Sequence, residues 1–177
     1  ASLDDQSISR AIADTTNTVC EGELLQLANR NNWQLDEQTY FQIIRRKTAS
    51  LCGTCCRLSA QLAGHGDEVC EGLDVYGENV GVAFQIVDDL LDLVGSETTV
   101  GRTRGRELAK GKLPLPLIRH LQVANEPLRR QLLDVLTSNG HGLDAAAFEL
   151  SRRWITESGA VEYANDWATR LVDRAKA

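Results

Sequence analysis

Several kinds of residue and segment are scarce or missing in this sequence. It contains no methionine and only 3 prolines among 177 residues, and aromatic residues make up 5% of it. Because proline breaks helices, its scarcity leaves room for long ones. No apolar run approaches the length of a membrane span, and no signal-peptide pattern opens the chain. We therefore expect no stable membrane anchor and a cytoplasmic location.

The charge of the chain also limits its function. With 25 acidic and 19 basic residues, the net charge is −6, which argues against a general nucleic-acid-binding protein. The 5 cysteines are an odd number and indicate reduced thiols. Cys52 and Cys55 have the spacing that begins a zinc site, but no second Cys or His pair follows, so tight helix packing is favoured. We assign no role to the three histidines, placed in loops or on polar faces: His65, His120 and His141.

Apolar residues recur mostly at spacings of three and four, and strand-like alternation is rare. These patterns predict an all-α fold. The predicted helices cover about 7–29, 37–62 and 67–95, followed by shorter ones after 114, 127 and 143. We interpret residues 1–177 as a single domain. Because methionine is absent and neither end has a clear boundary, we expect it to be a piece of a longer chain.

The stretch from Gly81 to Asp92 combines acidic groups with an apolar sequence. Asp88, Asp89 and Asp92 place three carboxylates within five residues of an otherwise apolar sequence. Helical spacing puts Gln85 on the same face as Asp88 and Asp92. Desolvated carboxylates are costly without a cation, so this face predicts a divalent metal site. The adjoining stripe is predicted to be buried: Leu73, Tyr76, Val80, Phe84, Val87 and Leu91.

A lysine interrupts the apolar face of the helix predicted over 37–62. The inward stripe of this helix is predicted to comprise Tyr40, Ile44, Lys47, Leu51 and Cys55. Lysines are seldom fully buried without a partner. Two interpretations remain open: Lys47 extends to the surface from the edge of the stripe, or it is a buried cation that serves an anionic ligand.

Two glycine-containing segments also have two interpretations each. Residues 101–112 contain five cations and three glycines; they form either a mobile loop that closes on phosphate or a solvated run of charge. Gly22 interrupts the first predicted helix. It either allows two helices to pack closely or faces a site.

Taken together, four segments resemble the motifs of the trans-type polyprenyl diphosphate synthases. Phe84 to Asp92 resembles their second aspartate-rich motif, and Lys47-Thr48 resembles their Lys-Thr pair. Upstream, Gly22-Glu23 with Gln26 resembles a Gly-Glu-x-x-Gln element. Tyr76-Gly77 and Gly81 lead into the Phe-Gln pair in the expected order. Several motifs in the right order make this resemblance specific.

The resemblance implies a fold and a reaction. The fold would be an all-α helical bundle of the isoprenoid synthase type, usually homodimeric. The reaction would be head-to-tail condensation of isopentenyl diphosphate with an allylic diphosphate, assisted by Mg²⁺. Asp88 would be the main metal ligand of this motif, supported by Asp89 and Asp92.

The remaining site residues are also assigned by this resemblance. Lys47 would bind the allylic diphosphate, and Arg102 and Lys112 would add cations from the loop. Thr48 and Gln85 would place oxygen dipoles near the developing allylic cation, which is a form of electrostatic stabilisation.

The sequence departs from the family pattern in two ways. In the loop, Arg102 replaces a lysine, Glu107 an aspartate and Pro114 a threonine. More importantly, the first aspartate-rich motif and the arginine pair that follows it are absent. We therefore expect the C-terminal portion of a larger prenyltransferase domain, with a bundle that is incomplete in this chain and little or no synthase activity on its own.

A second class of function remains open. The chain could be a non-catalytic helical subunit, or a degenerate homologue, that partners a true synthase. The altered loop and the missing motif favour this alternative, whereas the intact aspartates and Lys47 disfavour it. A terpene cyclase fits less well, because those enzymes rarely combine this motif with the Lys-Thr and Gly/Lys elements.

Overall fold

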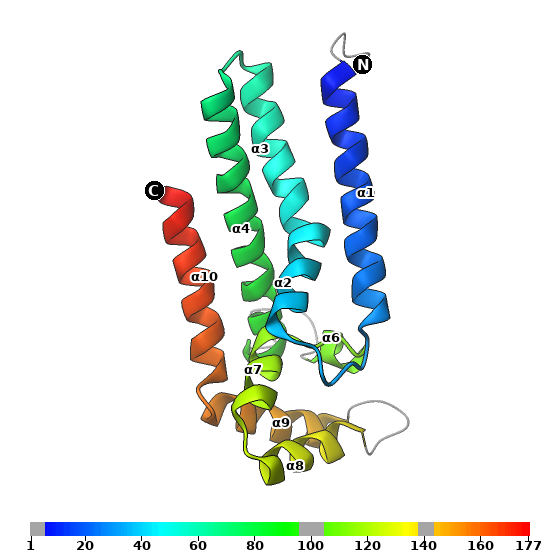
Figure 1. Ribbon diagram of the computed structural model, residues 1–177. Coiled ribbons are helices and arrows are strands. Elements are labelled where there is room, and N and C mark those ends of the chain that lie inside the picture. Colours follow the sequence, from blue (N-terminus) through cyan, green and yellow to red (C-terminus); the bar gives the residue numbers. More distant parts are fainter. Residues whose placement is uncertain (1–5, 96–104, 138–143) are drawn as a thin grey trace. The chain divides into compact units, whose positions relative to one another are not determined.

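The computed structural model describes residues 6–95, 105–137 and 144–177, and every regular element among them is a helix (Figure 1). The predicted all-α fold is thus confirmed. None of the helices in these ranges is long and apolar enough to cross a bilayer. The chain divides into two compact units. Where described, the first contains residues up to 28, 38–85 and 168–177, and the second contains 29–37 and 86–167.

Long helices make up the first unit. α1 (Gln6–Ala28), α3 (Ser50–Leu62) and α4 (Asp67–Val94) run side by side (Figure 1). The hydroxyls of Thr15 on α1 and Thr54 on α3 are 2.7 Å apart and share a hydrogen bond. On α4, Gly81 allows close approach, since a Cβ there would lie 2.6 Å from Ala49 Cα. Small residues therefore bring these backbones together.

The helix predicted over 37–62 is interrupted by a π-helical turn. α2 (Glu37–Ile44) continues into the π-helix η1 (Arg45–Ala49) and then into α3. A π-turn holds one residue more than an α-turn, which rotates the following side chains by about 100°. Tyr40 and Ile44 are buried as predicted, but Leu51 is 52% exposed and Cys55 is also exposed. That part of the stripe was wrong, and the buried positions are Ala49, at the end of the π-helix, and Gly53 and Ala60 on α3.

The apolar stripe predicted to be buried on α4 is largely exposed. Phe84 is 65% exposed and Tyr76 42%. Leu73, Val87 and Leu91 are also exposed. The buried apolar residues lie on another side of the helix: Val82, Ala83, Ile86, Leu90 and Leu93. α4 is therefore apolar on two sides, and periodicity alone does not tell which of them packs within this chain.

Shorter helices make up the second unit. They are α6 (Arg106–Ala109), α7 (Leu115–Val123), α8 (Glu126–Thr137), α9 (Ala145–Glu157) and the first turns of α10 (Ala160–Lys176). The end of α4, from Ile86 onward, also belongs to this unit. α7 begins directly after Pro114, and Gly159, with a φ of 75°, separates α9 from α10. The start of α7 matches the sequence prediction. Leu117, Leu132 and Ile155 from three of these helices are completely buried.

His120 is in the core and not on a polar face, so its predicted placement was wrong. It lies on α7, is 4% exposed, and its Nδ1 has no hydrogen-bond partner among the described residues. Burial lowers the pKa of its imidazole, because a charged ring would be desolvated. His65 is exposed, and His141 lies outside the described residues.

We expect this buried imidazole to make stability depend on pH. Its pKa is lower in the folded protein than in the unfolded chain, so protonation favours unfolding. The free energy of unfolding should fall as the pH drops below about 6.5, by at most about 1.4 kcal/mol per pH unit from this group. Urea unfolding at pH 7.5 and 5.5 measures the effect. His120→Leu should reduce the difference, and the exposed-site control His65→Leu should not; equal curves for the two variants would contradict the assignment.

Candidate active site

The predicted site residues fall in both units. The first unit holds Lys47, Thr48 and Gln85. The second holds Asp88, Asp89, Asp92 and Lys112. Arg102 lies outside the described residues.

Lys47 is held by two residues of α1. Its Nζ lies 2.5 Å from Glu23 Oε2 and donates a hydrogen bond to Gln26 Oε1 at 2.9 Å. The Lys47 side chain is 35% exposed, so it is neither fully buried nor extended freely into solvent. Sequence reasoning found the motif that contains Glu23 and Gln26 but gave neither residue a role. The Gly-Glu-x-x-Gln motif was the sequence signal by which these two residues could have been found.

The π-helix directs neighbouring residues to different helices. Lys47 meets α1, whereas the Thr48 hydroxyl donates to Gln85 Oε1 on α4 at 3.1 Å. Gly22 lies against this turn, because a Cβ at Gly22 would be 2.6 Å from Lys47 N. Close packing at Gly22 is therefore confirmed, and the packing is directly beside Lys47. π-turns in helices are often found at functional sites.

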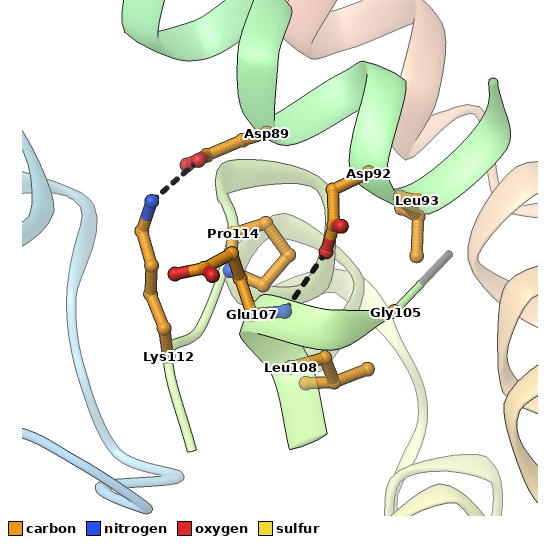
Figure 2. A pocket seen from close by; sticks show the side chains of 8 residues that line it. All are labelled: Asp89, Asp92, Leu93, Gly105, Glu107, Leu108, Lys112 and Pro114. Carbon is orange, nitrogen blue, oxygen red and sulfur yellow. Dashed lines mark hydrogen bonds and ion pairs between the residues drawn. The ribbon is translucent and has the colours of Figure 1, made fainter. Parts of the chain in front are cut away.

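In the second unit, Asp89 and Lys112 form a buried ion pair (Figure 2). Lys112 Nζ is 2.6 Å from Asp89 Oδ1, and the two side chains are 12% and 1% exposed, respectively. Lys112 directly follows Gly111, whose carbonyl accepts a hydrogen bond from Asn31 N at 2.9 Å. This backbone contact helps to position the lysine. The charge of Asp89 is thus balanced by Lys112 within the protein. Its neighbour Asp88 is only half-buried.

Asp92 connects α4 to the start of α6. Its Oδ2 accepts a hydrogen bond from Glu107 N at 3.1 Å (Figure 2), and its main-chain oxygen accepts one from Gly105 N at 2.9 Å. The Oδ1 atom of Asp92 is buried and has no hydrogen-bond partner in the described part of the chain. A carboxylate oxygen in that condition is a candidate ligand for a cation or a water molecule.

A small cavity lies between these acidic and basic groups. It has a volume of about 10 Å³, which is room for about one water molecule and not for a diphosphate. Figure 2 shows the side chains that line it, which include Asp89, Asp92, Glu107 and Lys112. A larger pocket of about 720 Å³, lined by residues 31–36 and parts of α7 and α8, includes none of the predicted site residues.

The carboxylates of α4 partly fit a magnesium site. Mg²⁺ is commonly bound through one or two carboxylates together with phosphate oxygens and water. Asp88 and Asp92 lie one helical turn apart and offer two such carboxylates, whereas Asp89 is bound by Lys112. Within the described ranges, no cluster of three or more His, Cys, Asp or Glu side chains could hold a metal ion. The carboxylates of Asp88 and Asp92 therefore fit an ion whose other ligands are phosphate oxygens or water.

The cysteines of α3 do not form a second candidate site. Burial, with a smaller contribution from Cys55 and Cys56, raises the pKa of the Cys52 thiol. Burial also raises the pKa of Cys56. Protonated thiols are poor ligands and nucleophiles. Cys52 packs near Gly81 as expected for helix packing, but Cys55 is exposed.

The fold and these groups define an all-α protein with carboxylates suited to a cation and a lysine suited to an anion. Residues 1–149 match the sequence profile of the polyprenyl synthetase family. This chain belongs to that family.

Relatives and solved structures agree with this assignment. The chain is 33% identical to the short chain isoprenyl diphosphate synthase of Methanothermobacter thermautotrophicus over 176 residues, 98% of this chain and 53% of the relative. It is 31% identical to heptaprenyl diphosphate synthase component 2 of Geobacillus stearothermophilus, covering 99% of this chain and 53% of the relative. A Caulobacter crescentus polyprenyl synthase complexed with calcium and isoprenyl diphosphate matches with a TM-score of 0.89 and 31% identity, over 97% of this chain and 52% of that one. The chain spans about half the length of these proteins.

Proposed function

We propose that this chain supplies part of the Mg²⁺–diphosphate site of a polyprenyl diphosphate synthase. That enzyme condenses isopentenyl diphosphate head to tail with an allylic diphosphate. The observation that carries the proposal is on α4, where the buried, unpartnered Oδ1 of Asp92 lies one turn from Asp88. Both carboxylates are positioned on a rigid helix, and one of them has a coordination position that no described residue uses.

Each site residue has a distinct part in this proposal. Asp88 is the main Mg²⁺ ligand, Asp92 supports it, and Asp89 acts through its ion pair with Lys112. A bound Mg²⁺ would supply charge stabilisation to the departing diphosphate. Lys47 binds the allylic diphosphate, and Arg102 and Lys112 are further cations for diphosphate binding.

Thr48 and Gln85 complete the proposed site. Their hydrogen bond fixes both side chains between the π-helix and α4, which prepares their oxygen dipoles for the developing allylic cation. We further propose that the active protein is a cytoplasmic homodimer. The 177 residues would then be part of a larger prenyltransferase domain that also carries a first aspartate-rich motif.

A non-catalytic role beside a true synthase is the second candidate. It is favoured by the similarity to a relative named as component 2 of a heptaprenyl diphosphate synthase. Glu107 and Pro114 favour it too, since they differ from the family loop. The two candidates predict different behaviour toward diphosphate, because a degenerate homologue has no need to bind it.

Asp88→Ala should weaken Mg²⁺-dependent binding of inorganic diphosphate at least about tenfold, because it removes a carboxylate from the metal. Isothermal titration calorimetry of the chain, with and without Mg²⁺, measures this. Asp173→Ala is the matched control, since it makes the same charge change at an exposed position of α10. Equal affinity in the two variants would contradict the proposal, and a wild-type chain that binds no diphosphate would favour the second candidate.

A further inference from the structure

The ammonium of Lys47 already has an anionic partner in this structure. Glu23 Oε2 lies 2.5 Å from its Nζ, and the two side chains are 35% (Lys47) and 43% (Glu23) exposed. A lysine ammonium has three N–H donors. Glu23 and Gln26 engage two of them. The amide of Gln26 is neutral, so Glu23 alone offsets the charge of Lys47 in this group.

The contact between Glu23 and Lys47 is built into the packing of two helices. Gly22 lies so close to the π-helix that a Cβ would be 2.6 Å from Lys47 N and 2.9 Å from Arg46 Cβ. Glu23 is the next residue on α1, and the close approach at Gly22 delivers its carboxylate to the lysine. The backbone contact therefore places the two side chains within reach of each other.

This arrangement sets up a competition at Lys47. An incoming diphosphate and the Glu23 carboxylate are both anions and use the same cation. At 2.5 Å, the carboxylate engages one of the three donors and leaves fewer for phosphate oxygens, and its charge repels the ligand. An anion that binds at Lys47 must overcome both effects.

We propose that Glu23 is the counterion of Lys47 in the unliganded protein and is displaced from it by diphosphate. Glu23 thereby sets how tightly the site holds its anionic ligand. This inference rests on the proposed function, in which Lys47 binds diphosphate. It gives Glu23 a defined part in the release of a diphosphate product, because the carboxylate returns to Lys47 as the anion leaves.

Neutralising Glu23 should strengthen the binding of diphosphate. Glu23→Gln keeps the size and the accepting oxygen of the side chain but removes its charge. We expect the Kd of inorganic diphosphate in the presence of Mg²⁺ to fall about threefold to tenfold, and the gain to shrink as salt is raised. A loss of structure would not produce a gain in affinity.

Glu21→Gln is the matched control. Glu21 is on the same helix, two residues away, and its carboxylate pairs with Arg46 at 3.3 Å. The variant has the same net charge as Glu23→Gln, so we expect its Kd to change less than about twofold. Equal gains in the two variants would show an effect of net charge alone and would overturn the counterion role.

Lys47→Ala separates the inference from the function on which it rests. If Lys47→Ala binds diphosphate as tightly as the wild type, the role of Lys47 in the proposed function is contradicted, and the inference with it. If Lys47→Ala weakens binding but Glu23→Gln leaves it unchanged or weaker, only the counterion role is contradicted. Calorimetric titration of the four proteins gives all of these outcomes.

Discussion

Replacing Lys112 with methionine should lower the free energy of unfolding by about 3–5 kcal/mol. Methionine keeps most of the length of the side chain but not its charge. The Asp89 carboxylate, 1% exposed and 2.6 Å from Lys112 Nζ in the wild type, would then be buried without this cation. Burial of an uncompensated charge is costly. Urea unfolding at neutral pH, followed by far-UV circular dichroism, measures the change.

Two further variants test whether burial causes the effect. Arg130→Met breaks the exposed pair with Glu126, whose side chains are 74% (Arg130) and 57% (Glu126) exposed, and should cost less than about 1 kcal/mol. The double variant Asp89→Leu/Lys112→Met removes both buried charges and should recover most of the loss. If Lys112→Met costs no more than Arg130→Met, the ion pair is not important for stability.

The second large effect is expected at Gly22. Gly22→Ala should lower the free energy of unfolding by about 2–3 kcal/mol, as overpacking does. The added methyl would lie 2.6 Å from Lys47 N and 3.0 Å from Arg46 C. These are backbone atoms, which cannot rotate away as a flexible side chain would. The substitution should also disturb the contacts of Glu23 and Gln26 with Lys47, because α1 would be pushed away from the π-helix.

Gly72→Ala provides the comparison for Gly22. Gly72 is a helical glycine of α4, and a Cβ there would meet nothing within 4 Å. Alanine should therefore raise stability by about 0.5–1 kcal/mol through helix propensity. Opposite signs at the two glycines are expected in the same urea experiment. A Gly22→Ala variant as stable as Gly72→Ala would contradict the close contact with the π-helix.

The general form of the site could be predicted from the sequence, because its signals are local. Three aspartates in an apolar helical stretch indicated α4 and its acidic face, and the predicted end near residue 95 is close to the observed end at Val94. The sequence could not predict which of the three carboxylates would form an ion pair within the protein. Asp88 and Asp89 are chemically identical neighbours, and their burial and the contact of Asp89 with Lys112, 23 positions away, distinguish them.

Packing between helices explains the other differences. The residues of η1, Arg45 to Ala49, have no composition that marks a π-turn, and the contact with Gly22 comes from 23–27 positions upstream. The two apolar sides of α4 gave similar periodic signals, although mainly one is buried in this chain. His120 was misplaced for a related reason: a polar residue type gave no indication that Leu117 and Leu121 would share its burial.

The π-helix also limits how the length of this chain segment can vary. Tyr40 and Ile44 form a buried set before it, and Ala49, its last residue, forms a second buried set with Gly53. Deleting one residue between Ile44 and Gly53 would convert the turn to an ordinary α-helix and move one of these two sets out of the core. An inserted residue would have a similar effect. Related sequences should therefore differ by substitution between Ile44 and Gly53, and deletions and insertions should occur in other segments.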